Sequence, residues 1–134
     1  MHARQIGRTN PTSQARLQLI LVLLAAWDLL AFLLELTNTR LLRIGGIQGV
    51  LGARSVSGTL AVLAIAYLYA ARDPIRHRFV LWLATLEQFV ALFSVTFHWA
   101  RSDFGFGEAV VPIFLAAGFL VLLLTNLPRQ TDSA

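Results

Sequence analysis

The sequence predicts an all-α integral membrane protein, an antiparallel four-helix bundle, and its composition and apolar patterning lead to this conclusion. Of its 134 residues, 57% are hydrophobic and 13% are charged, whereas a soluble domain carries about 25% charged residues. Four apolar stretches have about the 20 residues that a helix needs to cross a membrane. Helices satisfy their backbone groups internally in lipid, and no stretch shows the alternating pattern of a barrel strand. We therefore expect one transmembrane domain over residues 1–134.

The predicted spans are 17–36, 52–71, 79–100 and 109–127, and the polar tails are 1–16 and 128–134. The apolar region of the first span is longer than that of a cleavable signal peptide, so we expect it to remain as a helix. Between the second and third spans, Asp73 favours a turn and Pro74 cannot continue a helix. These two spans should therefore be antiparallel neighbours.

Two further segments carry helix-breaking residues. The segment 40–53 is too glycine-rich for an ordinary span and too apolar for a solvated loop. We interpret it as an interfacial or re-entrant stretch. Near the start of the fourth span, Pro112 is expected to kink the helix or to open its first turn.

The distribution of basic residues predicts the orientation. All eleven are arginines, of which seven fall on the side of the termini and four on the opposite side. Cytoplasmic loops carry such an excess, so we expect both termini in the cytoplasm of a bacterium, with the chain in its inner membrane. The arginines are scattered between apolar spans rather than gathered in a patch. We therefore expect no nucleic-acid partner.

Four polar side chains fall in one predicted layer near the middle of the membrane. Counted at about 1.5 Å per residue from the cytoplasmic end of each span, Asp28 lies about 16 Å deep, and Glu87 and Gln88 lie about 13 Å and about 15 Å deep. Thr59 lies about 18 Å deep by the same count. A charge at a helix centre costs roughly 3 kcal/mol or more. The two acids should therefore face protein or trapped water rather than lipid.

Two interpretations of this layer remain open. In the functional one, Asp28 and Glu87 handle a proton or bind a ligand, as ionisable residues inside membranes commonly do. In the structural one, a carboxyl bonded to Gln88 or Thr59 holds helices together. We assign no catalytic residue, because no nucleotide-binding or metalloprotease motif occurs. We also predict no metal site, since the chain has no cysteine and shows no metal-binding pattern.

A second predicted layer, at roughly 26 to 29 Å by the same count, contains Glu35, Arg54 and His98. An ion pair that fixes the outer ends of two helices is favoured here, and an anionic substrate at Arg54 is the alternative. His98 also raises the question of a haem or chlorophyll ligand. The chain offers no second histidine at membrane depth, so a histidine beside Trp99 in an aromatic belt is favoured. The cofactor is left unknown.

Helical spacing links these layers. Glu87, Ala91, Ser94 and His98 share one face of the third predicted helix. Small residues of the second helix, such as Ala64, permit close helix approach. Tyr67 in the same helix is expected in the cytoplasmic aromatic belt.

Several local features resemble small bacterial four-span families. They are Arg54 and Gly58 at the start of the second span, the ARDP turn at 71–74, and His98 with Trp99 at the end of the third span. The nearest families are the DoxX-like and BphX-like groups, which have no well-defined shared activity. The resemblance therefore implies the topology and assigns no site residue. The sterol-isomerase-like fold, whose ligand cavity is lined by membrane carboxylates, is a second likeness: Asp28 fits it, whereas Glu87 lies in the third span rather than the neighbouring one.

The sequence favours a small non-enzymatic accessory subunit that contacts the lipid bilayer and packs with other membrane subunits or with copies of itself. The reason is that short loops leave little soluble surface for catalysis. One alternative is a small-molecule- or lipid-binding protein, or an acid/base enzyme, with a cavity lined by Asp28, Thr59, Glu87 and Gln88. Another is a proton-coupled carrier that works as an oligomer.

Overall fold

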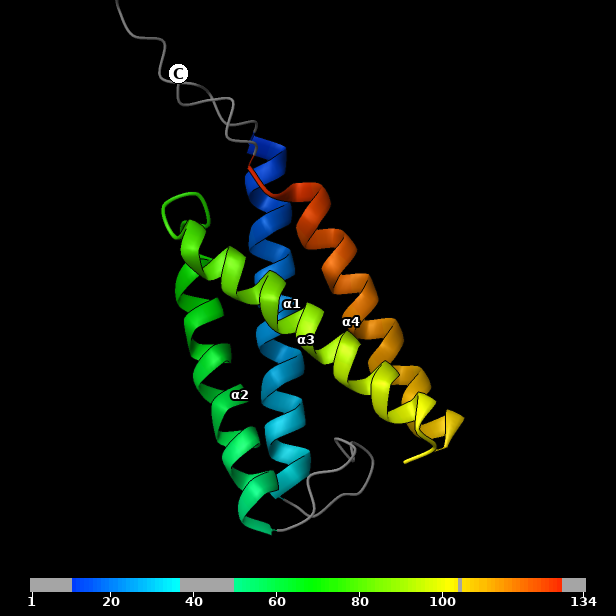
Figure 1. The fold of residues 1–134 in the computed structure, drawn as a ribbon. Coiled ribbons are helices and arrows are strands. Elements are labelled where there is room, and N and C mark those ends of the chain that lie inside the picture. The colour runs from blue at the N-terminus through cyan, green and yellow to red at the C-terminus, as the bar shows by residue number, and fades with distance from the viewer. Residues whose placement is uncertain (1–10, 37–49, 104, 129–134) are drawn as a thin grey trace, which may run out of the picture.

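The computed structural model describes residues 11–36, 50–103 and 105–128, apart from the side chains of Glu35 and of 50–56. Within these ranges it contains four helices and no strand: α1 (Pro11–Leu36), α2 (Val50–Ala70), α3 (Arg78–Ala100) and α4 (Phe106–Asn126). Consecutive helices run in opposite directions (Figure 1). The predicted all-α, antiparallel four-helix fold is confirmed.

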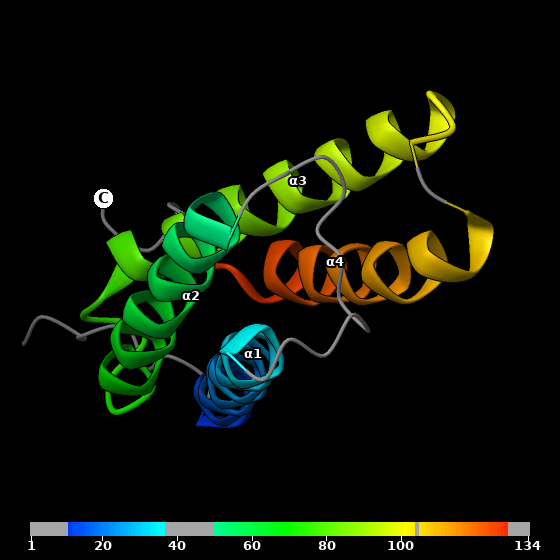
Figure 2. The same cartoon turned by 90° about the horizontal axis from the view of Figure 1, so that it is seen from below.

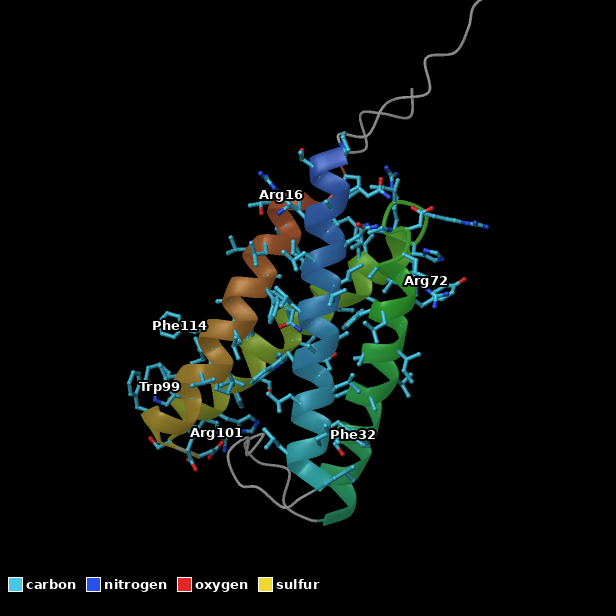
Figure 3. The ribbon with its side chains drawn as sticks, turned by 180° about the vertical axis from the view of Figure 1, so that it is seen from behind. Arg16, Phe32, Arg72, Trp99, Arg101 and Phe114 are labelled. Carbon is cyan, nitrogen blue, oxygen red and sulfur yellow. The ribbon has the colours of Figure 1, made fainter. Side chains whose placement is uncertain are left out.

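Three of the described helices, α1, α3 and α4, are long and apolar enough to cross a membrane. The apolar part of α2 found among the described residues, Ser57–Ala70, is shorter. Large apolar side chains are exposed on all four helices, and Phe114 and Trp99 point outward in Figure 3. Such a surface is stable in lipid and is a liability in water. The chain is therefore a membrane protein whose outer surface suits contact with the bilayer.

The helices pack mainly as two pairs. Contacts are most extensive between α1 and α2 and between α3 and α4, and they are fewer between α1 and α4 and between α2 and α3. Helix α3 begins beside the end of α2, crosses α1 and ends far from α2 (Figures 1 and 2). The expectation that the second and third spans pack as neighbours is thus met only near their turn. A tight turn determines where two helices meet, and side-chain packing determines how they diverge.

The turn between α2 and α3 forms where the sequence predicts it. The backbone N–H of Asp73 donates to the carbonyl of Ala70 at 3.1 Å, and its own carbonyl accepts from the N–H of His77 at 3.2 Å. The carboxylate of Asp73 accepts from the N–H of Arg76 at 3.2 Å, and the side chain of Pro74 is fully buried. Asp73 therefore accepts hydrogen bonds from two backbone donors of the turn that leads into α3.

The core lies between α1 and the other helices. On α1, the buried residues recur at alternating steps of three and four, which is one face of a helix: they include Leu17, Leu21, Leu24, Asp28 and Ala31. On α2, buried alanines allow α1 to approach closely. The buried residues of α3, Leu81, Ala84, Thr85 and Gln88, all belong to its first half. This half of α3 packs into the core, and the second half does not.

The helix boundaries differ from the predicted spans in detail. Helix α1 begins at Pro11 rather than at residue 17, so part of the predicted polar tail is helical. In the segment 40–53, residues from Val50 onward belong to α2, and the rest lies outside the described residues. Pro112 lies inside α4, which continues through it.

Two neighbouring alanines of α1 test this packing. Ala25 is fully buried in the core, whereas Ala26 is exposed. Ala25→Leu should lower the free energy of unfolding by about 1–3 kcal/mol because it overpacks the core. Ala26→Leu is the matched control and should leave it nearly unchanged. Unfolding in mixed micelles measures both, and equal effects would contradict the packing described here.

Candidate functional site

Asp28 occupies a core position on α1. It lies one helical turn from Leu24 and Ala31 on the buried face of the helix, and 2% of its surface is exposed. Acidic residues are almost never this buried without a partner. The position of Asp28 therefore needs either a counterpart from another helix or a ligand.

A second acid, Glu87, lies on α3 and is held by two donors. The phenol of Tyr67, on α2, donates a hydrogen bond to Oε2 of Glu87. The side-chain amide of Gln88 donates to the same oxygen at 3.3 Å. Tyr67 is fully buried and Gln88 is 4% exposed. Because these donors come from two helices, they hold the carboxyl in one place and stabilise negative charge on it.

The carboxyl of Asp28 lies close enough to Glu87 for the two charges to repel each other. Its Oδ2 is buried and accepts no hydrogen bond from any residue that the structure describes. Neither acid takes part in an ion pair with a described residue. A buried acceptor without a donor costs about 1–3 kcal/mol, so such groups call for a specific explanation. We name Asp28, Tyr67, Glu87 and Gln88 the acidic cluster.

The structure brings together three of the four residues in the predicted mid-membrane layer. Asp28, Glu87 and Gln88 meet in the bundle, whereas the side chain of Thr59 is exposed. Ser57 is buried, and a residue two positions further lies about 200° around the helix. Thr59 therefore has the depth of the layer but faces the other way.

Tyr67 is the residue of this site that sequence reasoning missed. The prediction of an aromatic-belt position is wrong for Tyr67, which is fully buried. Tyr69 is 57% exposed, and its ring contacts His77 edge-on at 4.8 Å. The signal was present, because Tyr67 lies three residues after Ala64 and thus on the face of small residues that packs against α1.

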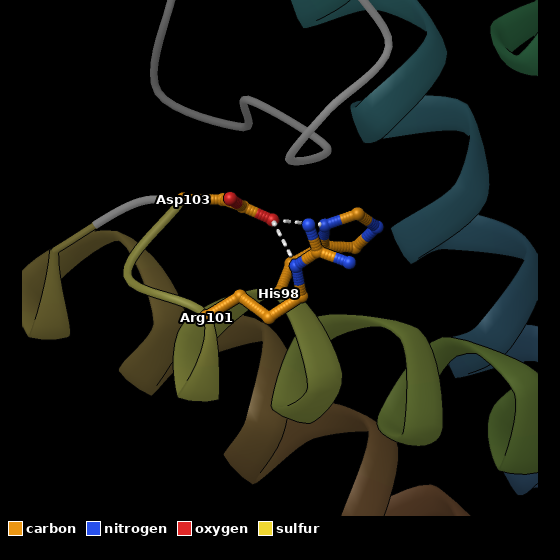
Figure 4. Close-up of polar contacts among 3 residues, drawn as sticks. All are labelled: His98, Arg101 and Asp103. Carbon is orange, nitrogen blue, oxygen red and sulfur yellow. Dashed lines mark hydrogen bonds and ion pairs between the residues drawn. The ribbon is translucent and has the colours of Figure 1, made fainter.

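The predicted outer layer is only partly described. His98 lies at the end of α3, and its Nδ1 is 2.6 Å from Oδ2 of Asp103, with which it pairs (Figure 4). The Nε of Arg101 lies 4.0 Å from the same oxygen. Ser102 between them has a φ of 60°, a left-handed conformation that tightens the turn. The side chains of Glu35 and Arg54 lie outside the described residues, so their predicted ion pair stays a prediction.

The described residues contain no group of three or more histidine, cysteine or acidic side chains that could hold a metal ion. His98 is half-buried, and its ring contacts Phe97 edge-on at 5.6 Å. The favoured place of His98 in an aromatic belt stays a prediction, and ligation of a haem or a pigment stays its open alternative. What the described geometry offers instead is the acidic cluster, which can accept hydrogen bonds from a small bound group.

The fold and the acidic cluster together define the class: a small helical membrane protein with two facing acids in its interior. No protein-family model, curated protein or solved structure matches the chain. The resemblance to DoxX-like and BphX-like proteins therefore stays a prediction, and function has to be argued from the cluster itself.

The two tyrosines of α2 test the bond to Glu87. Tyr67→Phe removes its buried donor and should lower the free energy of unfolding by about 1 kcal/mol, the usual size for such bonds in membranes. Tyr69→Phe keeps the ring contact with His77 and should have no effect. Unfolding of both variants in mixed micelles makes the comparison. Equal stabilities would show that the bond contributes nothing.

Proposed function

We propose that this protein is a membrane-embedded binding protein for a small molecule that donates a hydrogen bond to Asp28. The observation that carries the proposal is the buried Oδ2 of Asp28, which lacks a donor among the described residues. A polar atom of this kind destabilises the empty protein, and a ligand with an N–H or O–H group would remove the cost. A purely structural carboxyl would be expected to have found a donor on a neighbouring helix.

The surroundings of Asp28 support binding in a defined geometry. Leu24 and Ala31 flank Asp28 on the buried, apolar face of α1. On the other side, Glu87 presents a second acceptor whose position is set by Tyr67 and Gln88. A binding site in which the polar groups are few and already positioned loses little entropy when a ligand enters.

Association with other membrane subunits or with further copies of the chain is a second candidate function. It is favoured by Gly107 and Gly118, two exposed glycines of α4 with open space where a Cβ would stand. Small residues on an exposed face let a second helix approach. Purification from the native membrane, with identification of the chains that accompany the protein, tests this. A single monomeric chain would contradict it.

We also propose that the protein resides in a bacterial inner membrane with both termini in the cytoplasm. Exposed arginines gather at the end of the bundle where α1 begins and α2 turns into α3: Arg16, Arg72, Arg76 and Arg78. Figure 3 places Arg16 and Arg72 at that end and Arg101 at the other. This asymmetry supports the proposed orientation, because cytoplasmic loops carry the excess of arginine.

Asp28→Asn separates binding from stability. The variant keeps the shape of the side chain and removes the unpartnered acid from the core, so the free energy of unfolding should rise by about 1–3 kcal/mol. Hexylamine and hexanol, which share one alkyl chain, serve as probes in nanodiscs. At least one should stabilise the parent protein against heat and should do so less in the variant.

The matched control is Asp103→Asn, which changes an acid of the outer turn and should respond to the probes as the parent does. If neither probe binds the parent, or if Asp28→Asn loses stability and leaves probe binding unchanged, Asp28 is a structural residue and the binding proposal is wrong.

Single cysteines test the orientation, because the chain contains none. Ala15→Cys and Ser102→Cys place a thiol at exposed positions on opposite ends of the bundle. A membrane-impermeant maleimide applied to spheroplasts should label Cys at position 102 and reach position 15 only after permeabilisation. The reverse labelling pattern would show that both termini lie on the opposite side of the membrane.

A further inference from the structure

We propose that the ligand of the acidic cluster is a primary ammonium cation, and that it enters in exchange for one proton. This inference rests on the proposed binding function and adds the charge class of the ligand and its coupling to protons. It is carried by the arrangement of the two acids and the hydrogen bonds around them.

The first step is the charge inside the bundle. The titratable groups that face the cluster are Asp28 from α1, Tyr67 from α2 and Glu87 from α3. The one titratable residue of α4, Glu108, lies in its first turn and bonds to the N–H of Gly105 at 3.1 Å. No described arginine or histidine pairs with either acid of the cluster. Two unbalanced negative charges at this depth would be costly, so the empty cluster holds one proton and carries one negative charge.

The second step is the position of that proton. Oε2 of Glu87 accepts hydrogen bonds from Tyr67 and from Gln88, and two donors stabilise the negative charge there. Asp28 has no comparable donor on its Oδ2 among the described side chains. The geometry therefore assigns the charge to Glu87 and the proton to Asp28.

The third step is the exchange. When an ammonium group enters, the O–H bond of Asp28 breaks, its proton leaves to water, and an N–H of the ligand donates to the carboxylate that results. One positive charge enters and one leaves, so the net charge of the cluster is unchanged. Burial of the cation is then offset by the two carboxylates of the cluster.

The geometry distinguishes an ammonium from other cations. Metal ions such as Ca²⁺ take about six to eight oxygen ligands. The described residues contain no group of three or more histidine, cysteine or acidic side chains that could hold such an ion. A quaternary ammonium has no N–H to donate to Asp28. A primary ammonium has three donors, which match Asp28, Glu87 and the phenol oxygen of Tyr67.

Calorimetry on the full chain in nanodiscs tests the exchange. Hexylamine is titrated near neutral pH in two buffers that differ in ionisation enthalpy, with hexanol and sodium chloride as separate arms. The difference in observed binding enthalpy between the two buffers should correspond to one proton released for each hexylammonium bound. The apparent Kd for hexylammonium should fall about tenfold for each unit of pH increase in this range. Hexanol and sodium should release no proton.

Two variants of the cluster and one control complete the test. Asp28→Asn keeps a polar side chain of the same shape but has no proton to release, so proton release should disappear and hexylammonium should bind at least about tenfold more weakly. Asp103→Asn is the matched control and should keep both the proton release and the affinity for hexylammonium. Glu87→Gln removes the charge that remains in the empty cluster and should also weaken hexylammonium binding.

The outcomes separate this inference from the function on which it rests. If hexanol binds as tightly as hexylamine, or if hexylammonium binds without proton release, the cluster binds small molecules but the ammonium exchange is wrong. If sodium releases the proton as well as hexylammonium does, the ligand class is wrong. If no probe binds, the proposed binding function is wrong as well.

Discussion

Burial of two acidic side chains in a medium that solvates charge poorly is the constraint on which the interior of this protein depends. Asp28 stands in a row of core positions that apolar residues otherwise fill. Glu87 lies on another helix within range of electrostatic interaction with Asp28. A bundle that was selected for stability alone would place a leucine at this point of α1, because buried acids are costly even when they are paired.

The bundle accommodates this constraint unevenly. Tyr67 and Gln88 supply two hydrogen bonds to Glu87, and the described residues supply none to Oδ2 of Asp28. The asymmetry makes the two acids different in role although they are alike in chemistry. One is a fixed part of the scaffold, and the other is a group with unused bonding capacity. Such differences between neighbouring acids are what separates their tasks in many sites.

Helix packing explains why the cluster forms where it does. The alanines of α2 allow α1 to lie close, so the phenol of Tyr67 reaches across to Glu87 rather than into lipid. Helix α3 enters the core through Leu81, Ala84 and Gln88 and then diverges. Its second half, with exposed Phe93 and Phe97, lies outside the core. The acidic cluster thus joins α2 to the buried first half of α3 through the bond between Tyr67 and Glu87, and the turn of His98 and Asp103 lies at the far end of α3.

The sequence by itself determined the fold class, the four helices and the turn at Asp73 and Pro74, and it predicted a depth for each polar residue. These follow from composition, helix length and the constant rise per residue, which are properties of one chain segment at a time. Only the tertiary structure decided which residues of equal depth meet. Thr59 shares the depth of the layer and faces outward, and Tyr67 turned out to be the donor to Glu87. His98 pairs with Asp103, a partner that spacing along the helices did not indicate. The physical reason is that the partners of a side chain depend on the rotation and crossing of whole helices, which are set by packing between segments distant in the chain.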